Sequence, residues 1–266
     1  MSGETQNVTR YTWDKGALSC DTDVVVTEVP VALVYNGVSH VVMMATPTDL
    51  HDLALGFSLS ESILESPSQL LDCELTQRDK GIELTMTITA EPFMALKARR
   101  RNLTGRTGCG LCGVESLEQA IPAPKRVERD CKITHEALQQ AIINLDQRQS
   151  LKRRTGAVHG AAWCSVAGDI ELLREDVGRH NALDKLLGAL RGSAYSPEGF
   201  VLVTSRASYE MVAKVASCDI ALLAAVSAPT SLAIDQAQRS GLTLVGFVQP
   251  GRQVIYTYPE RIQQGS

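Results

Sequence analysis

Two cysteines set three positions apart are the residues of this sequence best suited to chemistry. They are Cys109 and Cys112, in the run Arg106-Thr107-Gly108-Cys109-Gly110-Leu111-Cys112-Gly113. Two thiols at this spacing can share a metal ion, exchange a disulfide, or act as nucleophile and helper. The neighbouring glycines leave the sulfurs open to another molecule, and the upstream arginine favours the reactive thiolate. We therefore expect a reactive pair rather than two idle loop cysteines.

Three kinds of site use such a pair, and the surrounding sequence disfavours each of them. A structural zinc site needs four ligands, and the chain has no second CxxC. A thioredoxin-like pair opens a helix after a strand, whereas this pair lies in a glycine-rich loop. A nucleobase deaminase needs a glutamate two residues after its histidine, but Ala161 follows His159 and the order of the motifs is reversed. Thiol-based sulfur or redox chemistry, with no structural metal, remains.

Three further segments are candidates for ligand binding. The run from Arg174 to Lys185 is rich in polar groups, and it fits a charged helix start and a polar pocket floor equally well. Ser205-Arg206-Ala207-Ser208 follows a predicted buried strand and opens a helix, where backbone N–H groups could hold a phosphate. The segment Phe247-Val248-Gln249-Pro250-Gly251-Arg252 ends the last predicted strand, either as a simple turn or as a place where an arginine meets an anion.

Composition places the chain among globular proteins. It has 266 residues, of which 44 % are hydrophobic and 21 % charged, enough to bury a core without a disulfide or a metal. The net charge is −4, and basic runs at 97–106 and 152–154 are interpreted as solvated faces, so no nucleic-acid binding is expected. No apolar run could span a bilayer, and the first 20 residues lack the pattern of a secretory signal. We expect a cytoplasmic protein without membrane attachment.

The distribution of apolar residues predicts an α/β protein in four parts. Residues 1–22 are expected to form a loose tail and 23–101 a small α+β lobe. Residues 102–130 are expected to be a glycine-rich CxxC loop and connector, and 131–266 an α/β lobe. In this last lobe, strands alternate with helices, which predicts a mostly parallel sheet covered on both faces.

Local signals mark several turns and helix starts. Asn36-Gly37 and Gly168-Asp169 are typical of hairpin turns. Expected helix caps are Thr48 or Asp49, Thr134 and Thr230. The predicted strands include 84–88, 163–166, 170–173, 200–204, 220–226 and 243–248, and the predicted helices include 179–190 and 207–217.

Six segments, in order along nearly the whole chain, together resemble one known family. They are Thr46-Pro47 through Leu53-Ala54-Leu55-Gly56-Phe57, Thr107 to Gly113, Thr155-Gly156-Ala157-Val158-His159, Glu175 to Lys185, Ser205 to Glu210, and Ala228-Pro229-Thr230-Ser231. This ordered set is similar to the formate dehydrogenase accessory sulfurtransferase family (FdhD-type). The resemblance implies a C-terminal cytidine-deaminase-like three-layer lobe without deaminase activity, a smaller α+β N-terminal lobe, and a homodimer.

The same resemblance implies a function for the candidate residues. Cys109 would accept persulfide sulfur from a cysteine desulfurase, with Cys112 as helper. The sulfur would pass to a bound Mo-bis(molybdopterin guanine dinucleotide), which is cargo for formate dehydrogenase. The cofactor would contact the segment from Phe247 to Arg252, and we expect weaker contributions from Arg179, His180 and Arg206. The alternative is a chaperone of the molybdenum cofactor that never carries sulfur. Two departures from the family pattern are Gly108, where serine is common, and Gln249-Pro250 in the cofactor segment.

Overall fold

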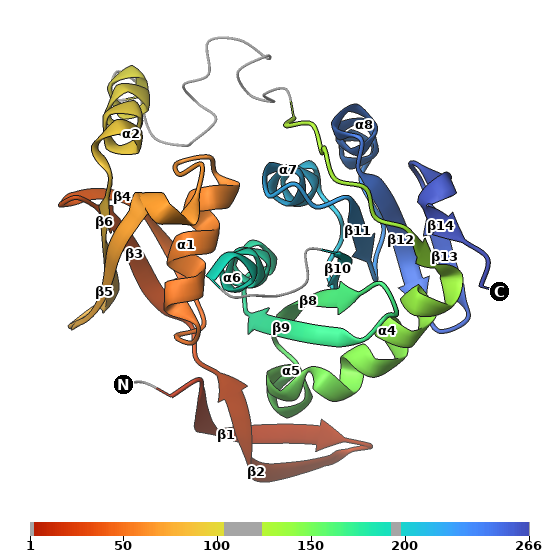
Figure 1. Cartoon of the computed structure of the whole chain (residues 1–266). Helices are drawn as coiled ribbons and strands as arrows, with labels where there is room; N and C mark the ends of the chain where they lie inside the picture. The colour runs from red at the N-terminus through yellow and green to blue at the C-terminus, as the bar shows by residue number, and fades with distance from the viewer. Residues whose placement is uncertain (1–2, 104–123, 193–197, 266) are drawn as a thin grey trace.

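Residues 1–22 were expected to form a loose tail, but residues 5–22 instead build most of a β-hairpin. A computed structural model describes residues 3–103, 124–192 and 198–265, without the side chains of 100–103. In it, β1 (Thr5–Asp14) and β2 (Ala17–Val26) pair antiparallel and project from the rest of the chain (Figure 1). Lys15 and Gly16 both have positive φ, 47° and 88°, as a two-residue type I′ turn requires. The tail prediction was wrong because residues 5–22 are mostly polar and carry no run of apolar residues.

The N-terminal lobe is a four-stranded sheet with two α-helices and one short 3-10 helix. Its strands are β3 (Val29–Tyr35), β4 (Val38–Ala45), β5 (Leu70–Arg78) and β6 (Gly81–Ile88), in the order β4-β3-β6-β5. Its helices are α1 (Leu50–Ser60), the short η1 (Pro67–Gln69) and α2 (Ala90–Leu103). The predicted turn at Asn36-Gly37 is confirmed, because it joins β3 to β4. Asp49 precedes α1 as predicted, but its side chain makes no capping hydrogen bond.

The C-terminal lobe is a six-stranded sheet in the order β13-β12-β11-β10-β8-β9. Only β10, β11 and β12 run parallel, while β8–β9, β8–β10 and β12–β13 are antiparallel. The prediction of a mostly parallel sheet was therefore wrong at both edges, where hairpins add the outer strands. The strands are β8 (His159–Ser165), β9 (Ile170–Asp176), β10 (Gly199–Val203), β11 (Leu222–Ala225), β12 (Thr243–Gln249) and β13 (Arg252–Ile255).

Helices cover both faces of this sheet, with α6, α7 and α8 on one face and α4 and α5 on the other (Figure 1). Their bounds are α4 (His135–Arg148), α5 (Ser150–Thr155), α6 (Arg179–Gly192), α7 (Tyr209–Ser217) and α8 (Ser231–Ser240). Thr134 and Thr230 accept the predicted capping hydrogen bonds from Ala137 N and Ala233 N. Two short strands, β7 (Ile133–Thr134) and β14 (Ile262–Gln263), pair beside η2 (Pro259–Arg261). The cytidine-deaminase-like form of this lobe stays a prediction.

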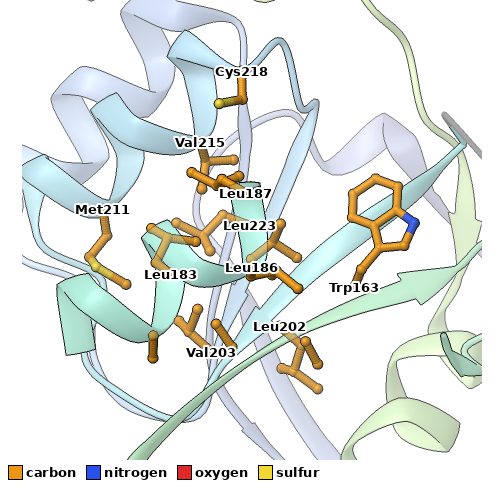
Figure 2. Close-up of a cluster of buried hydrophobic side chains, with 14 of the residues drawn as sticks. Trp163, Leu183, Leu186, Leu187, Leu202, Val203, Met211, Val215, Cys218 and Leu223 are labelled. Carbon is orange, nitrogen blue, oxygen red and sulfur yellow. The ribbon is translucent and has the colours of Figure 1, made fainter. Parts of the chain in front are cut away.

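The core of the C-terminal lobe lies between the sheet and α6 and α7 (Figure 2). Leu183 and Leu186 of α6, Leu202 of β10 and Leu223 of β11 have no exposed surface. Each fully buried leucine contributes about 1.5–3 kcal/mol of hydrophobic free energy. Within the described ranges, no helix is long and apolar enough to cross a membrane.

The two lobes meet where α1 crosses α6 (Figure 1). Gly56 on α1 and Gly188 on α6 lie at the crossing. A Cβ added to Gly56 would lie 1.7 Å from the carbonyl oxygen of Asp184, and one added to Gly188 would lie 1.9 Å from that of Asp52. Only glycine allows the two helix backbones to approach this closely. The lobes therefore pack as one unit through a direct helix-to-helix contact.

Candidate functional site

The carboxyl-terminal edge of the six-stranded sheet gathers most of the predicted motif segments. Because β10, β11 and β12 are parallel, the segments at their carboxyl ends, 204–208, 226–230 and 247–252, lie at one edge. β8 runs antiparallel to β10, and β9 antiparallel to β8, so β8 begins and β9 ends at this same edge. His159 and the run 177–180 therefore lie there as well. Ligands of open α/β sheets bind at such an edge.

Backbone hydrogen bonds tie the loops of this edge to one another. Ala207 N donates to Ala228 O (3.3 Å), and Thr230 N donates to Ala207 O (3.1 Å). Phe247 N donates to Ser227 O (3.2 Å). The loops after β10, β11 and β12 are thus held in place before any ligand arrives. The predicted helix at 207–217 begins only at Tyr209, and the N–H of Ala207 is already used within the edge rather than open to a phosphate.

The segment from Phe247 to Arg252 forms a tight corner between β12 and β13. Phe247 has a positive φ of 52°, and the register of the two strands shifts between Gly246 and Gln249. The guanidinium carbon of Arg252 lies 5.7 Å from the centroid of the Phe247 ring. Gly251 N donates to Gln139 Oε1 of α4 (2.7 Å), which fixes the tip of the corner.

Some residues of this corner are buried and others are exposed, and only the exposed side chains can contact a ligand. Val248 is fully buried, so its side chain belongs to the core and cannot touch a ligand at the edge. Gln249, Pro250, Gly251 and Arg252 are exposed. The corner therefore presents an exposed cation over an aromatic ring, an arrangement suited to an anionic ligand with planar groups.

The three weaker candidates lie further along the edge. His180 Nε2 on α6 lies 3.0 Å from Glu210 Oε2 on α7, without the alignment of a hydrogen bond. Burial lowers the pKa of His180, and Glu210 opposes that shift. Arg206 is exposed on the loop after β10, and Arg179 begins α6.

Five strand spacings separate β13, where Arg252 begins, from β9, after which Arg179 follows. At about 4.8 Å per spacing, this is on the order of 24 Å. The structure therefore brings His180 close to the start of α7 but leaves it far from Arg252. A ligand that touches both ends of the edge has to be elongated.

The structure contains a buried ion pair beneath the edge, which the sequence analysis did not predict. Asp176 and Lys185 are both fully buried, and Nζ lies 2.6 Å from Oδ2. The carboxylate also accepts from Thr46 N (3.0 Å), Gly178 N (2.8 Å) and Asn181 Nδ2 (3.1 Å). Lys185 Nζ donates to Thr46 O (2.9 Å). This part of the 174–185 run is therefore structural, because it ties the second lobe to the first at Thr46.

A second charged cluster joins α1, α6 and α7. Lys214 Nζ donates to Ser60 Oγ (2.9 Å), Glu61 Oε1 (2.6 Å) and both carboxylate oxygens of Asp184 (3.0 Å each). Burial lowers the pKa of Lys214, but Asp184 and Glu61 outweigh it, so the net pKa is raised and the group is charged. Lysine and aspartate at helix positions predict solvent exposure from sequence alone, and only the contact between the lobes buries them.

The structure describes five of the seven cysteines and His159. Cys109 and Cys112 lie outside the described residues, as does Arg106. Of the other five cysteines, Cys131, Cys164 and Cys218 are buried, Cys73 is half-buried and Cys20 is exposed, and all are free thiols. Burial raises the pKa of Cys73 to about 11, so its thiol is protonated.

Burial lowers the pKa of His159, and the nearby charge of Arg179 lowers it further. Among the described residues, no group of three His, Cys, Asp or Glu side chains could hold a metal.

The fold is mixed α/β, and backbone hydrogen bonds hold the loops at one edge of its six-stranded sheet. Comparison with known proteins gives the family. The model of the FdhD/NarQ family matches residues 26–263. A protein of Cupriavidus necator named "Sulfur carrier protein FdhD" is 54 % identical over 252 residues, covering 94 % of this chain and 88 % of its own length. The chain therefore belongs to the FdhD/NarQ family.

Other relatives and one solved structure agree. Proteins of the same name from Variovorax paradoxus and Xanthomonas euvesicatoria are 52 % and 50 % identical, covering 90 % and 91 % of this chain and 87 % of their own lengths. A crystal structure described as a formate dehydrogenase accessory protein from Desulfotalea psychrophila is similar with a TM-score of 0.75. It shares 24 % sequence identity and covers 97 % of this chain and 99 % of its own. This likeness supports the mixed α/β fold.

Proposed function

We propose that this chain is a sulfur carrier that serves the maturation of formate dehydrogenase. The observation that carries the proposal is the match to curated relatives named as sulfur carriers, which extends over 94 % of the chain at 54 % identity. The CxxC pair of Cys109 and Cys112 supplies the thiol chemistry that such a carrier needs. We further propose that it works in the cytoplasm.

In the first step, Cys109 takes sulfur from a cysteine desulfurase. The Cys109 thiolate attacks the outer sulfur of the desulfurase persulfide, so that one S–S bond forms on Cys109 while the other breaks and leaves the desulfurase as a thiolate. No outside oxidant is needed. Only one thiol of the pair ionises readily, because the first thiolate disfavours the second. The family resemblance assigns that role to Cys109, which is also closer than Cys112 in sequence to Arg106.

In the second step, Cys112 releases the sulfur. Its thiol attacks the inner sulfur of the Cys109 persulfide, which forms a Cys109–Cys112 disulfide and frees the outer sulfur as hydrosulfide. The pair thereby supplies the two electrons that turn sulfane sulfur into sulfide, and a cellular dithiol restores it. The acceptor in this proposal is the Mo-bis(molybdopterin guanine dinucleotide), bound as cargo.

The edge of the six-stranded sheet is the proposed place for this cargo. The two guanine nucleotides of the cofactor make it long and anionic. The edge extends on the order of 24 Å between strands β13 and β9. Arg252 over Phe247 offers a cation and a ring at one end, and Arg206, Arg179 and His180 add donors along it. The main chain and exposed side chains of 249–252 are the proposed contacts, with Val248 serving only the core.

Activation of formate dehydrogenase in cells that lack this chain tests the proposal. The parent should restore the activity, Cys109→Ala should abolish it, and Cys20→Ala is the matched control because Cys20 is an exposed cysteine outside the pair. If Cys109→Ala restores activity as well as the parent, the chain acts without sulfur transfer. That result would favour the second candidate, a chaperone of the molybdenum cofactor that supports insertion only by binding.

A further inference from the structure

A cavity of about 560 Å³ lies between the two lobes. Its walls come from the end of α1 and the segment behind it, from α2, and from the ends of α6 and α7. Both α6 and α7 begin at the candidate ligand edge and end before β10 and β11 begin, so the cavity lies toward the opposite edge of the sheet. None of its described lining residues belongs to the six segments that carry the family resemblance. A cavity of this size suits a small molecule.

Three cationic residues from separate elements converge on this cavity. They are Arg99 of α2, Lys125 and Arg191 of α6. Among the ion pairs of residues 3–103, 124–192 and 198–265, none involves these three side chains. Glu65 is the one acidic residue in the described part of the lining. The cavity therefore has a surplus of positive charge, which concentrates anions from solution.

The end of α7 holds two of these cations next to each other. Lys125 Nζ donates to Ser217 O (3.2 Å), and Arg191 Nη2 donates to Cys218 O (2.5 Å). The two carbonyls belong to consecutive residues, so the two positive charges lie close together. Each contact caps the C-terminal end of the helix with one N–H group. A lysine has three such donors and an arginine five, so the helix cap alone does not use them.

The helix cap also does not account for Arg99, which comes from the N-terminal lobe. Arg99 and Lys125 line a neighbouring cavity of about 570 Å³ as well, together with Lys214. There Lys214 is paired with Glu61 (2.6 Å), and Glu210 is a further acid of the lining. These two acids offset most of the positive charge in the neighbouring cavity. The larger surplus is in the cavity with Arg191.

The wall that faces the cations is fixed by its own hydrogen bonds. Leu64 N donates to Ser58 O (2.9 Å), and Ser66 N donates to Gln69 Oε1 (3.3 Å). Ser62 lies in the same wall, and its hydroxyl is a further donor suited to an oxyanion. The cavity therefore has its shape before a ligand arrives, which lowers the cost of binding.

We propose that this cavity binds a small molecule with a multiply charged oxyanion group, either a phosphate ester or a polycarboxylate. The guanidinium groups of Arg99 and Arg191 hold the oxyanion through paired N–H donors, and Lys125 adds a point charge. Because Arg99 belongs to the N-terminal lobe and Arg191 to the C-terminal lobe, the bound anion links the two lobes. The inference is separate from the proposed cofactor edge and does not depend on sulfur transfer.

Calorimetric titration with pyrophosphate and with citrate, at one ionic strength, tests this site. All proteins in the titration carry Arg252→Ala, which removes the candidate cation at the opposite edge of the sheet. We expect at least one of the two anions to bind, and the tighter of them identifies the class of ligand. Arg99→Gln and Arg191→Gln should each weaken that binding about tenfold or more, the effect of a lost charge-assisted hydrogen bond.

Arg153→Gln is the matched control for these variants. Arg153 Nη1 also donates to a backbone carbonyl, that of Gln147 (3.2 Å), but Arg153 lies on α5, outside the cavity. The control removes the same charge and should leave the affinity unchanged. Circular dichroism checks that each variant is folded, and Arg99→Gln decides the matter if Arg191→Gln unfolds. The proposal fails if neither anion binds, or if Arg99→Gln binds as tightly as the control.

The melting temperature gives a second readout of the same site. A ligand that binds only the folded chain stabilises it, so the tighter anion at about 100 times its Kd should raise Tm by about 5 °C or more. The same concentration should raise the Tm of Arg99→Gln by less. Equal increases in Tm for Arg99→Gln and Arg153→Gln would contradict binding in this cavity.

Discussion

The crossing of α1 and α6 makes Gly56→Ala the most informative change to the fold. The added Cβ would lie 1.7 Å from the Asp184 carbonyl oxygen and 2.7 Å from the Gly188 nitrogen. An ordinary contact needs about 3.5 Å, so the two helices would have to separate by about 1.5–2 Å. The atoms in the way are backbone, which cannot rotate aside.

The expected loss of stability combines two effects of this separation. Overpacking of this kind costs about 1–3 kcal/mol. The move also stretches the hydrogen bonds that join Ser60 of α1 to Asp184 of α6 and to Lys214, each with a net contribution of about 1 kcal/mol. We expect a loss of about 3–5 kcal/mol, which corresponds to a decrease in Tm on the order of 10 °C for a chain of this size.

Urea and thermal unfolding followed by circular dichroism measure this loss. Gly192→Ala is the matched control, because Gly192 lies on α6, the other helix of the crossing, and an added Cβ there meets nothing within 4 Å. The control should be neutral or more stable by up to about 1 kcal/mol. If Gly56→Ala is as stable as Gly192→Ala, the close crossing does not hold the lobes together and the reasoning is refuted.

Three further predictions follow from the charged groups. Lys185→Met leaves Asp176 charged and buried, so urea unfolding should show a loss of about 3–5 kcal/mol; a loss below about 1 kcal/mol would contradict the ion pair. The folded chain holds the pKa of His159 below its ordinary 6.5, so the unfolded chain binds this proton more readily and stability falls as the pH drops below that value. His159→Gln should therefore lose less Tm than the parent on acidification, and equal losses would count against the assignment. Arg252→Ala should weaken guanine-nucleotide binding about tenfold or more in calorimetry, the effect of a lost charge-assisted hydrogen bond, whereas Lys80→Ala, in the exposed turn between β5 and β6, should not; equal affinities for parent and Arg252→Ala would exclude that contact.

Short-range signals in the sequence predicted individual elements well. Asn36-Gly37 gave the β3–β4 turn, and Thr134 and Thr230 gave helix caps, because each depends only on residues a few positions apart. The tail prediction for 1–22 failed because apolar residues of β1 and β2, such as Trp13 and Leu18, come together only when the two strands pair.

Gly168-Asp169 predicted the antiparallel β8–β9 hairpin, but the directions of the other strands needed information that no local pattern contains. The mostly parallel sheet was expected from the alternation of strands and helices, but β9 and β13 fold back through tight turns to form the outer strands. The segment at 247–252 was interpreted either as a turn or as a place where an arginine meets an anion, and the antiparallel β13 that begins at Arg252 was missed. Such a four-residue strand is too short to show a period.

The sequence predicted some features of the candidate site and missed others. The sequence predicted that ligand segments would follow the strands, and the structure places them at one edge of the sheet. It did not predict that Asp176 and Lys185 pair in the core, because burial of these charges depends on Thr46 from the other lobe. Contacts between distant parts of the chain decide which charged residues are structural.

Mapping of persulfide on the CxxC pair is the most direct test of the proposed sulfur carrier. The parent, Cys109→Ala and Cys112→Ala are incubated with a cysteine desulfurase and free cysteine, and the peptide that holds the pair is analysed by mass spectrometry. The account predicts a mass gain of one sulfur atom on Cys109 in the parent and in Cys112→Ala, and none in Cys109→Ala. Sulfur on Cys112 of the Cys109→Ala variant would show that the nucleophile was misassigned. No sulfur on the pair in any of the three proteins would contradict the sulfur carrier itself.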